Sequence, residues 1–360
     1  MQKSLSEMAA FIKGLIPRTI PESYELLPEF ERIADEKTVK NSIIAFRDFM
    51  LGLYDRLIAD AHLYESPQKV EKPENATHTS TAGNHPLLTH TKSILINIGY
   101  HGQLDENGNS LVFTDMQSLT TVISVDGSVK RAKISAPKII ESLKFLENCG
   151  VCFTGIDLKA KKPDILNINT LIITYPDNPA VLIGLKAMAV AQRDLQLVGN
   201  DDIFLRCDYR ALKMESSDAL DIIKDFTNPL NDEVRNLIVK LHNKCLEKGL
   251  SCTTSVKYMR IRSTYFYKSR AIWDITATVN YGYRLYIKAK NTDLYADLIK
   301  SFPKDLQEKI ARGYGCDKKR FGTQCRHGCH GFSFILNKSV LNISQYLEAW
   351  LDREYQCCYK

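Results

Sequence analysis

The sequence lacks the local motifs that mark the common nucleotide-binding and hydrolytic enzymes. It has no phosphate-binding G-x-x-x-x-G-K-S/T loop, no G-x-G-x-x-G turn, no H-E-x-x-H helix and no G-x-S-x-G nucleophile turn. Acidic pairs such as Asp201 and Asp202 stand in turn-forming sequence, where aspartate is expected in any case. No position stands out as a catalytic group, so the sequence favours binding over catalysis.

Long apolar runs are also missing. No stretch approaches the roughly 18 consecutive apolar residues that a membrane-spanning helix requires. The apolar segment near the N-terminus is interrupted by Glu7 and Lys13, which does not fit the uncharged core of a secretory signal. We therefore expect a cytoplasmic protein without a membrane partner.

Cysteine is too sparse for a disulfide-stabilised scaffold. The chain has 10 cysteines in 360 residues, whereas such scaffolds contain roughly 8–10% cysteine. In a reducing compartment, clustered cysteines are instead candidates for metal binding or redox chemistry. One cluster stands out, the segment GCDKKRFGTQCRHGCHGF at residues 315–332.

This segment places thiol and imidazole groups at close spacing, namely Cys316, Cys325, His327, Cys329 and His330. Three thiolates and one imidazole would complete a tetrahedral structural zinc site. The segment has one C-x-x-x-C pair where most zinc sites have two close pairs, so reduced thiols in a glycine-rich loop are an open alternative. A third interpretation is an anion site, in which its four basic side chains act with glycine amides.

Charge is unevenly distributed along the chain. Residues 1–85 contain ten Lys and Arg against thirteen Asp and Glu, whereas residues 240–290 contain eleven against two. A local excess of positive charge favours an anionic partner such as nucleic acid. The alternative is a solvated surface that acidic residues from elsewhere in the chain neutralise.

Composition divides the chain into five regions. Residues 1–64 carry apolar residues at helical spacing and are expected to form a helical N-terminal segment, whose apolar stripe also suits a homo-oligomer interface. Residues 65–85 are strongly polar and are expected to be a linker. Beyond them we expect a central α+β domain at 86–212, a connector at 213–235 and a basic C-terminal α+β domain at 236–360.

The central domain shows a helix followed by two strands. Ser135, Pro137 and Gly150 are typical of the N-cap, first turn and end of a helix. Two strands joined by a basic loop follow within residues 151–175, and a further helix and a short strand are expected at 178–195 and 202–212. A helix and then a hairpin with a basic tip form the end of a winged-helix domain, although many α+β folds share that order. In the winged-helix interpretation, phosphates are contacted by Lys138, Lys144, Lys159, Lys161 and Lys162.

The C-terminal domain is expected to be a mainly antiparallel sheet flanked by helices. Its strands interleave aromatic and basic residues with period two. This alternation predicts that one sheet face presents Arg260, Arg262, Arg284, Tyr286 and Lys288 together. Such a face suits a nucleic-acid backbone with a base stacked on the tyrosine, although polar residues on outward strand positions are also common in any sheet.

The function expected from these features is non-catalytic binding of nucleic acid or another polyanion. A first alternative is a sensor or enzyme for a small anionic ligand, held by the C-terminal sheet and the cysteine-rich segment. A second is a protein-interaction domain stabilised by one structural zinc ion.

Overall fold

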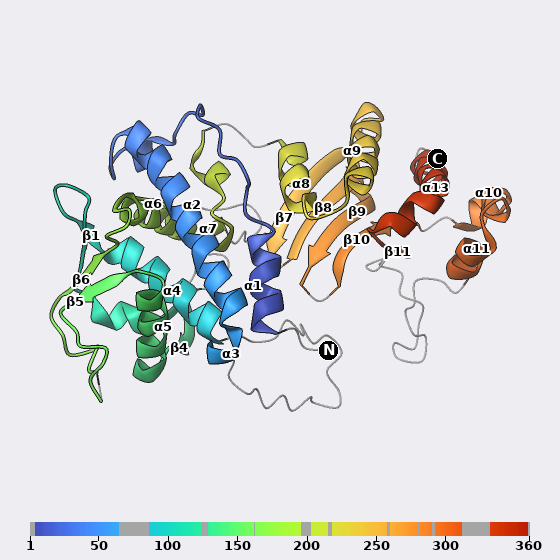
Figure 1. Cartoon of the computed structure of the whole chain (residues 1–360). Helices are drawn as coiled ribbons and strands as arrows, with labels where there is room; N and C mark the ends of the chain where they lie inside the picture. The colour runs from blue at the N-terminus through green and yellow to red at the C-terminus, as the bar shows by residue number, and fades with distance from the viewer. Residues whose placement is uncertain are drawn as a thin grey trace. The chain divides into compact units, whose positions relative to one another are not determined.

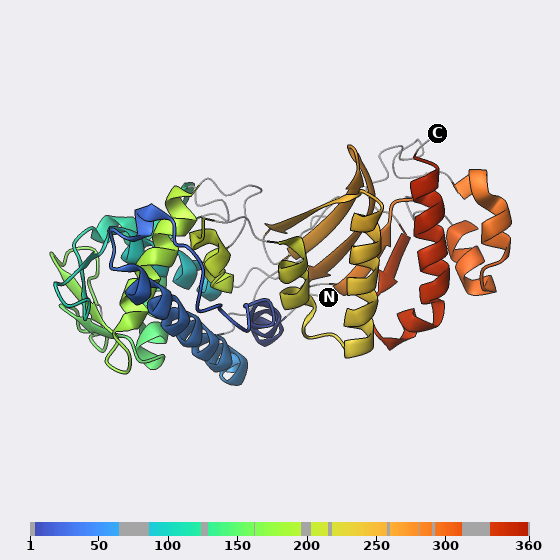
Figure 2. The ribbon, with the colours of Figure 1, turned by 90° about the horizontal axis from the view of Figure 1, so that it is seen from above.

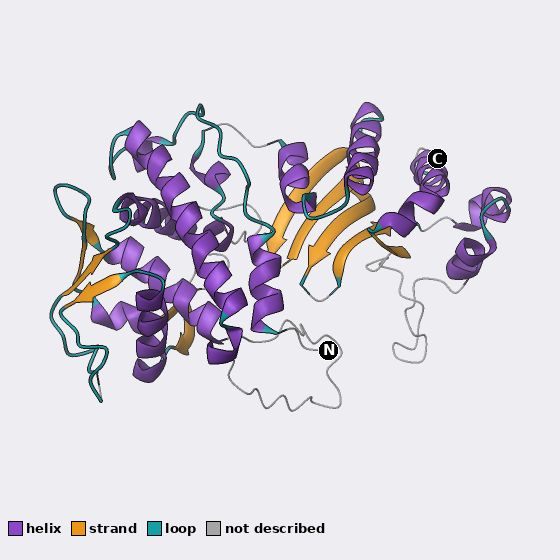
Figure 3. Ribbon diagram, in the orientation of Figure 1, coloured by secondary structure: helices purple, strands orange, loops and turns teal. Residues whose placement is uncertain are grey.

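The computed structural model describes residues 4–64, 86–123, 129–161, 163–195, 203–214, 218–257, 260–279, 281–289, 292–311 and 332–358. The chain divides into two compact units (Figure 1). Unit 1 comprises Met1–Ser217 with Val256–Met259, and unit 2 comprises Asp218–Ser255 with Arg260–Lys360. Both units combine helices with antiparallel strands (Figure 3), so the expected α+β class is confirmed.

Helices make up most of unit 1. Ser4 begins the first helix with a capping box shared with Glu7, and the Asp35 carboxylate caps the second by accepting from the Thr38 amide at 3.0 Å. The α-helices are α1 (Leu5–Lys13), α2 (Glu36–Ala59), α3 (Ala61–Tyr64), α4 (Pro86–His101), α5 (Ala136–Asn148), α6 (Ala180–Asp194) and α7 (Ile203–Arg206). Short 3₁₀ helices are η1 (Pro28–Phe30), η2 (Met116–Thr120) and η3 (Tyr209–Leu212).

One hydrophobic core runs from Leu5 to Leu212, so the N-terminal helices and the residues beyond 86 pack together. Helix α6 packs on α2 and α4. A Cβ atom at Gly184 would lie 2.2 Å from the Ser42 carbonyl oxygen, so α6 and α2 can approach this closely only because residue 184 has no side chain. The apolar stripe of α2, including Phe46 and Met50, is buried in this core. The stripe therefore stabilises unit 1 and is not free for the expected contact with a second copy. The expected linker at 65–85 lies outside the described residues.

Two small antiparallel sheets complete unit 1. The first has the strand order β1 (Gln103–Leu104), β2 (Leu111–Phe113), β6 (Leu171–Thr174) and β5 (Cys152–Thr154). Val112 pairs with Ile172, and Ile173 pairs with Phe153. The second is the hairpin β3 (Thr121–Ile123) and β4 (Val129–Lys133).

Unit 2 contains a five-stranded antiparallel sheet. The strand order is β11 (Phe332–Ile335), β10 (Gly282–Ile287), β9 (Arg270–Thr278), β8 (Arg260–Tyr267) and β7 (Ser251–Lys257). The helices are α8 (Ala219–Thr227), α9 (Asp232–Glu247), α10 (Ala296–Lys300), α11 (Lys304–Ala311) and α13 (Ser344–Gln356), with 3₁₀ turns η4 (Thr292–Tyr295) and η5 (Lys338–Ile343). Helices α10 and α11 are separated by residues 301–303, which include Pro303.

Helices cover one face of this sheet, with α9 and α13 side by side (Figure 2). The rings of Tyr265 and Trp273 stack with centroids 4.0 Å apart on that face. Tyr265 also shares a 2.8 Å hydrogen bond with His242 of α9, and Trp273 donates to the Cys245 sulfur at 3.1 Å. These contacts join α9 to strands β8 and β9.

The prediction of a strand at 202–212 is wrong. Among its described residues, 203–206 form α7 and 209–212 form η3. All four side chains of α7 are buried, so the run has no polar face that would show a helical period. In the part of the chain that the structure describes, no helix has the length and apolar character needed to cross a membrane.

Candidate functional site

The open face of the unit 2 sheet carries the basic residues that the sequence alternation placed together. Arg262 and Arg284 are both paired with Thr276, one on each side of β9. Arg260 lies two residues before Arg262, and Tyr286 two residues after Arg284, on the same face. Lys288 follows β10, with its ammonium group 5.6 Å from the centroid of the Tyr286 ring. The shared face is confirmed by this register, whereas its use as a binding surface stays a prediction.

An aspartate that the sequence interpretation missed lies in the middle of this face. Asp274 of β9 is fully buried and is paired with Thr264 on one side and Tyr286 on the other. Its Oδ2 atom forms ion pairs with the Arg262 guanidinium and, at 3.3 Å, with the Lys288 ammonium. Two of the four cations therefore already have an anionic partner.

A third cation on this face is also engaged within the sheet. The guanidinium of Arg284 donates to the Ser333 hydroxyl at 2.8 Å and to the Tyr281 carbonyl at 3.2 Å. Of the predicted basic residues here, Arg260 is the one classed as exposed. The face is therefore much less cationic than its sequence implies.

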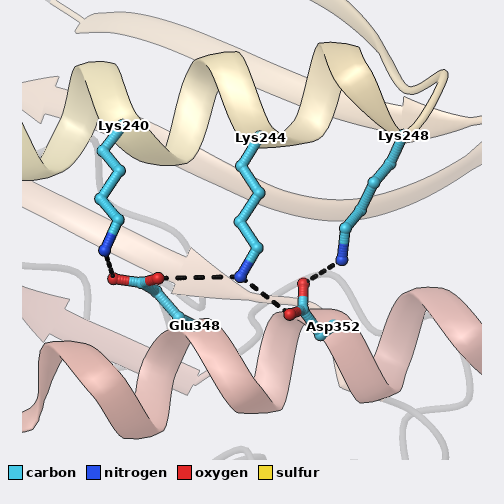
Figure 4. A network of polar contacts seen from close by, with 5 residues as sticks. All are labelled: Lys240, Lys244, Lys248, Glu348 and Asp352. Atoms are coloured by element: carbon cyan, nitrogen blue, oxygen red, sulfur yellow. Dashed lines mark hydrogen bonds and ion pairs between the residues drawn. The ribbon is translucent and has the colours of Figure 1, made fainter.

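Helix α9 shows the same neutralisation. Three lysines, Lys240, Lys244 and Lys248, face two carboxylates of α13 (Figure 4). Lys240 lies 2.7 Å from Glu348, Lys244 bridges Asp352 at 2.8 Å and Glu348 at 3.7 Å, and Lys248 pairs with Asp352. Burial alone would raise the pKa of Asp352, but the hydrogen bonds from Lys244 and Lys248 lower it overall. Part of the positive excess at 240–290 is thus balanced by two acids, Glu348 and Asp352, that lie more than 50 residues later in the chain.

The predicted residues of the central domain lie in a different environment. Lys138 and Lys144 are on α5, where Lys138 pairs with Glu141 at 2.5 Å and Lys144 is exposed. Lys159 and Lys161 are exposed on the loop between β5 and β6. This loop is longer than expected because β6 begins only at Leu171, and it is held on the core by two buried side chains, Leu158 and Ile165. Lys162 lies outside the described residues.

Strand β4 adds three basic side chains that were not singled out from the sequence. Lys130, Arg131 and Lys133 are exposed, as are the other two residues of the strand. Residues 134–135 alone separate β4 from α5, and the Ile134 amide donates to the Thr120 carbonyl at 2.7 Å. Three basic residues within five positions, shortly before a helix N-cap, are the sequence signal that could have identified them.

The side chains of Lys130, Arg131, Lys133, Lys144, Lys159 and Lys161 have no ion pair or hydrogen bond within the described part of the chain. In the view of Figure 1, β4, α5 and the loop after β5 lie along the lower side of unit 1. We call these six residues, together with Lys138, the β4–α5 surface.

The expected metal ligands Cys316, Cys325, His327, Cys329 and His330 all lie at 312–331, outside the described residues. Elsewhere in the described ranges, no group of three or more His, Cys, Asp and Glu side chains is placed to hold a metal ion. Burial raises the pKa of the Cys149 and Cys245 thiols to about 11. These thiols are therefore protonated at neutral pH and unsuited to nucleophilic chemistry.

Known proteins offer no guide to which of these surfaces is functional. No protein family, curated protein or solved structure matches this chain.

Proposed function

We propose that unit 1 binds nucleic acid through the β4–α5 surface, mainly by contacts to the phosphate backbone. The observation that carries this proposal is the contrast between the two basic regions. The cations of α9 and of the unit 2 sheet are largely paired with Glu348, Asp352 and Asp274. Six cations of the β4–α5 surface have no such partner among the described residues, so they are available to displace counterions from phosphates.

The order of elements supports a winged-helix-like arrangement for this surface. Helix α4 is followed by β2, α5 and the hairpin β5–β6, and β2 pairs with β6. In this arrangement α5 would lie against a groove, and the loop between β5 and β6 would contact the flanking backbone. The hairpin β3–β4 stands between β2 and α5 and would add Lys130, Arg131 and Lys133 to the same contact.

The proposal is tested by the salt dependence of binding. Fluorescence anisotropy would follow a labelled 25-base-pair duplex of mixed sequence, titrated with the full chain at several salt concentrations. If all six unpaired cations contact phosphates, the slope of log K against log salt is about −5. The triple variant Lys130→Glu, Arg131→Glu, Lys133→Glu should weaken binding and reduce the magnitude of that slope by about 3.

A matched control changes the same charge in unit 2. Lys300, Lys304 and Lys338 are exposed, and Lys300→Glu, Lys304→Glu, Lys338→Glu reverses three charges there. Binding by the β4–α5 surface requires this control to keep most of the affinity and slope. Equal losses in both triple variants, or a slope near zero for the unmodified chain, would refute the proposal.

A further inference from the structure

A cavity of about 530 Å³ lies in unit 1, next to α2. One face of α2 lines one side of the cavity. Its apolar side chains Ala45, Phe49 and Leu53 are buried and form the floor. The turn after α5 and the segment between β6 and α6 form the opposite wall. The ring of Tyr175 closes the floor by packing edge-on against Phe49, with ring centroids 5.2 Å apart. This volume lies within the range of small-molecule sites.

Gly52 stands in the middle of the 24-residue helix α2 and lines this cavity. A glycine inside a helix costs roughly 0.5–1 kcal/mol relative to alanine. At position 184 a glycine is required because α6 and α2 approach each other closely. At position 52 a Cβ atom would have no atom of the described residues within 4 Å. No contact with the described residues therefore requires a glycine at position 52. Glycine at such a place lets a ligand approach the helix backbone closely.

Some charged side chains around the cavity already have hydrogen-bond partners within the protein, and one has none among the described residues. Arg56 donates to Asp60 and to the Asn148 carbonyl, each at 3.1 Å. Asp48 accepts two hydrogen bonds from Arg47. Asp177 makes no ion pair or hydrogen bond through its side chain within the described residues. A Cβ atom at Gly150 would lie 3.2 Å from the Tyr175 ring and 3.8 Å from the Asp177 carboxylate, so this carboxylate lies beside the aromatic wall. Burial first, and then the charge of Asp177, raise the pKa of the Tyr175 phenol.

We infer that this cavity is a binding site for a small planar aromatic molecule that carries a cationic nitrogen group. The flat ring packs against the backbone of α2 at Gly52 and against the aromatic pair Phe49 and Tyr175. The nitrogen group pairs with the unoccupied carboxylate of Asp177. This site is separate from the β4–α5 surface and does not depend on nucleic-acid binding.

The test uses benzamidine as the probe and benzoate as its charge-reversed control, both observed by saturation-transfer NMR with the full chain. Benzamidine should bind saturably with millimolar affinity, as its size allows, and benzoate should not. Gly52→Leu should fill the cavity and remove the saturable signal. Asp177→Asn should weaken benzamidine binding about threefold, because it removes one exposed charge pair.

Asn41→Leu is the matched control, since it adds the same side chain at an exposed position of α2 outside the cavity. It should leave benzamidine binding unchanged. Leucine is a better helix former than glycine, so Gly52→Leu is expected to fold. Its circular dichroism spectrum is compared with that of the unmodified chain to separate a filled cavity from misfolding. Unsaturable benzamidine binding, equal affinity for benzoate, or binding that survives in Gly52→Leu would each overturn the assignment.

Discussion

Two glycine-to-alanine substitutions in neighbouring helices of unit 1 should change stability in opposite directions. At Gly184 of α6, a Cβ atom would lie 2.2 Å from the Ser42 carbonyl oxygen and 2.7 Å from the Phe46 Cβ atom of α2. The helices would have to separate, and such overpacking costs about 1–3 kcal/mol. A gain in helix propensity of roughly 0.5–1 kcal/mol offsets part of this cost. At Gly52 the same gain is unopposed, because a Cβ atom there would have no atom of the described residues within 4 Å.

The two variants are compared by urea unfolding with two optical probes. Far-ultraviolet circular dichroism reports on both units, whereas tryptophan fluorescence reports on unit 2, since the only two tryptophans are Trp273 and Trp350. Gly184→Ala should lower the dichroism midpoint of unit 1, and Gly52→Ala should raise it by an amount that corresponds to roughly 0.5–1 kcal/mol. A Gly184→Ala variant as stable as the unmodified chain would show that α2 and α6 are not packed through their backbones as described.

Two further predictions concern unit 2. Burial lowers the pKa of His242 in the folded protein, so protonation of this side chain opposes folding. The contribution of His242 to the free energy of unfolding is therefore greatest above the pKa of an unfolded histidine, near 6.5, and is lost as the pH falls through the folded pKa. The urea midpoint by tryptophan fluorescence should therefore fall less between pH 7.5 and 5 in His242→Gln than in the unmodified chain, and an equal fall in both would contradict this reasoning. Asp352→Asn removes the ion pairs with Lys244 and Lys248, whose groups are about one third exposed; it should cost about 0.5–1 kcal/mol at low salt and less in 1 M NaCl. A salt-independent loss would assign the effect to packing instead.

Local signals were sufficient to predict the helices and strands with well-marked ends. Ser135 and Pro137 at the start of α5 and Gly150 just beyond its end are confirmed, and Gly150 has the positive φ of 92° that favours glycine at a helix end. The period-two alternation in unit 2 likewise predicted which residues share a sheet face. These features depend on neighbours a few residues apart, which a single sequence displays.

The electrostatic state of those residues could not be predicted in the same way. Asp274 neutralises Arg262 and Lys288 only because β8, β9 and β10 are adjacent in the sheet, which is a matter of strand pairing. Helices α9 and α13 show the same limit, since their ion pairs join residues about 100 positions apart. The complementary four-residue spacing of lysines on α9 and carboxylates on α13 was visible in the sequence, but nothing local showed that the two helices would meet.

The ion pairs between α9 and α13 mean that the last helix lowers the positive charge on the surface of unit 2. Glu348 and Asp352 supply the two negative charges that face three lysines of α9. A shortened chain that ends before Ser344 would lose both carboxylates and leave Lys240, Lys244 and Lys248 in a row, with one lysine on every helical turn. Such a fragment would attract polyanions through a surface on which the full chain balances two of the three positive charges. Nucleic-acid binding by a C-terminally truncated protein would therefore add an exposed lysine row in unit 2 to whatever the β4–α5 surface of unit 1 contributes.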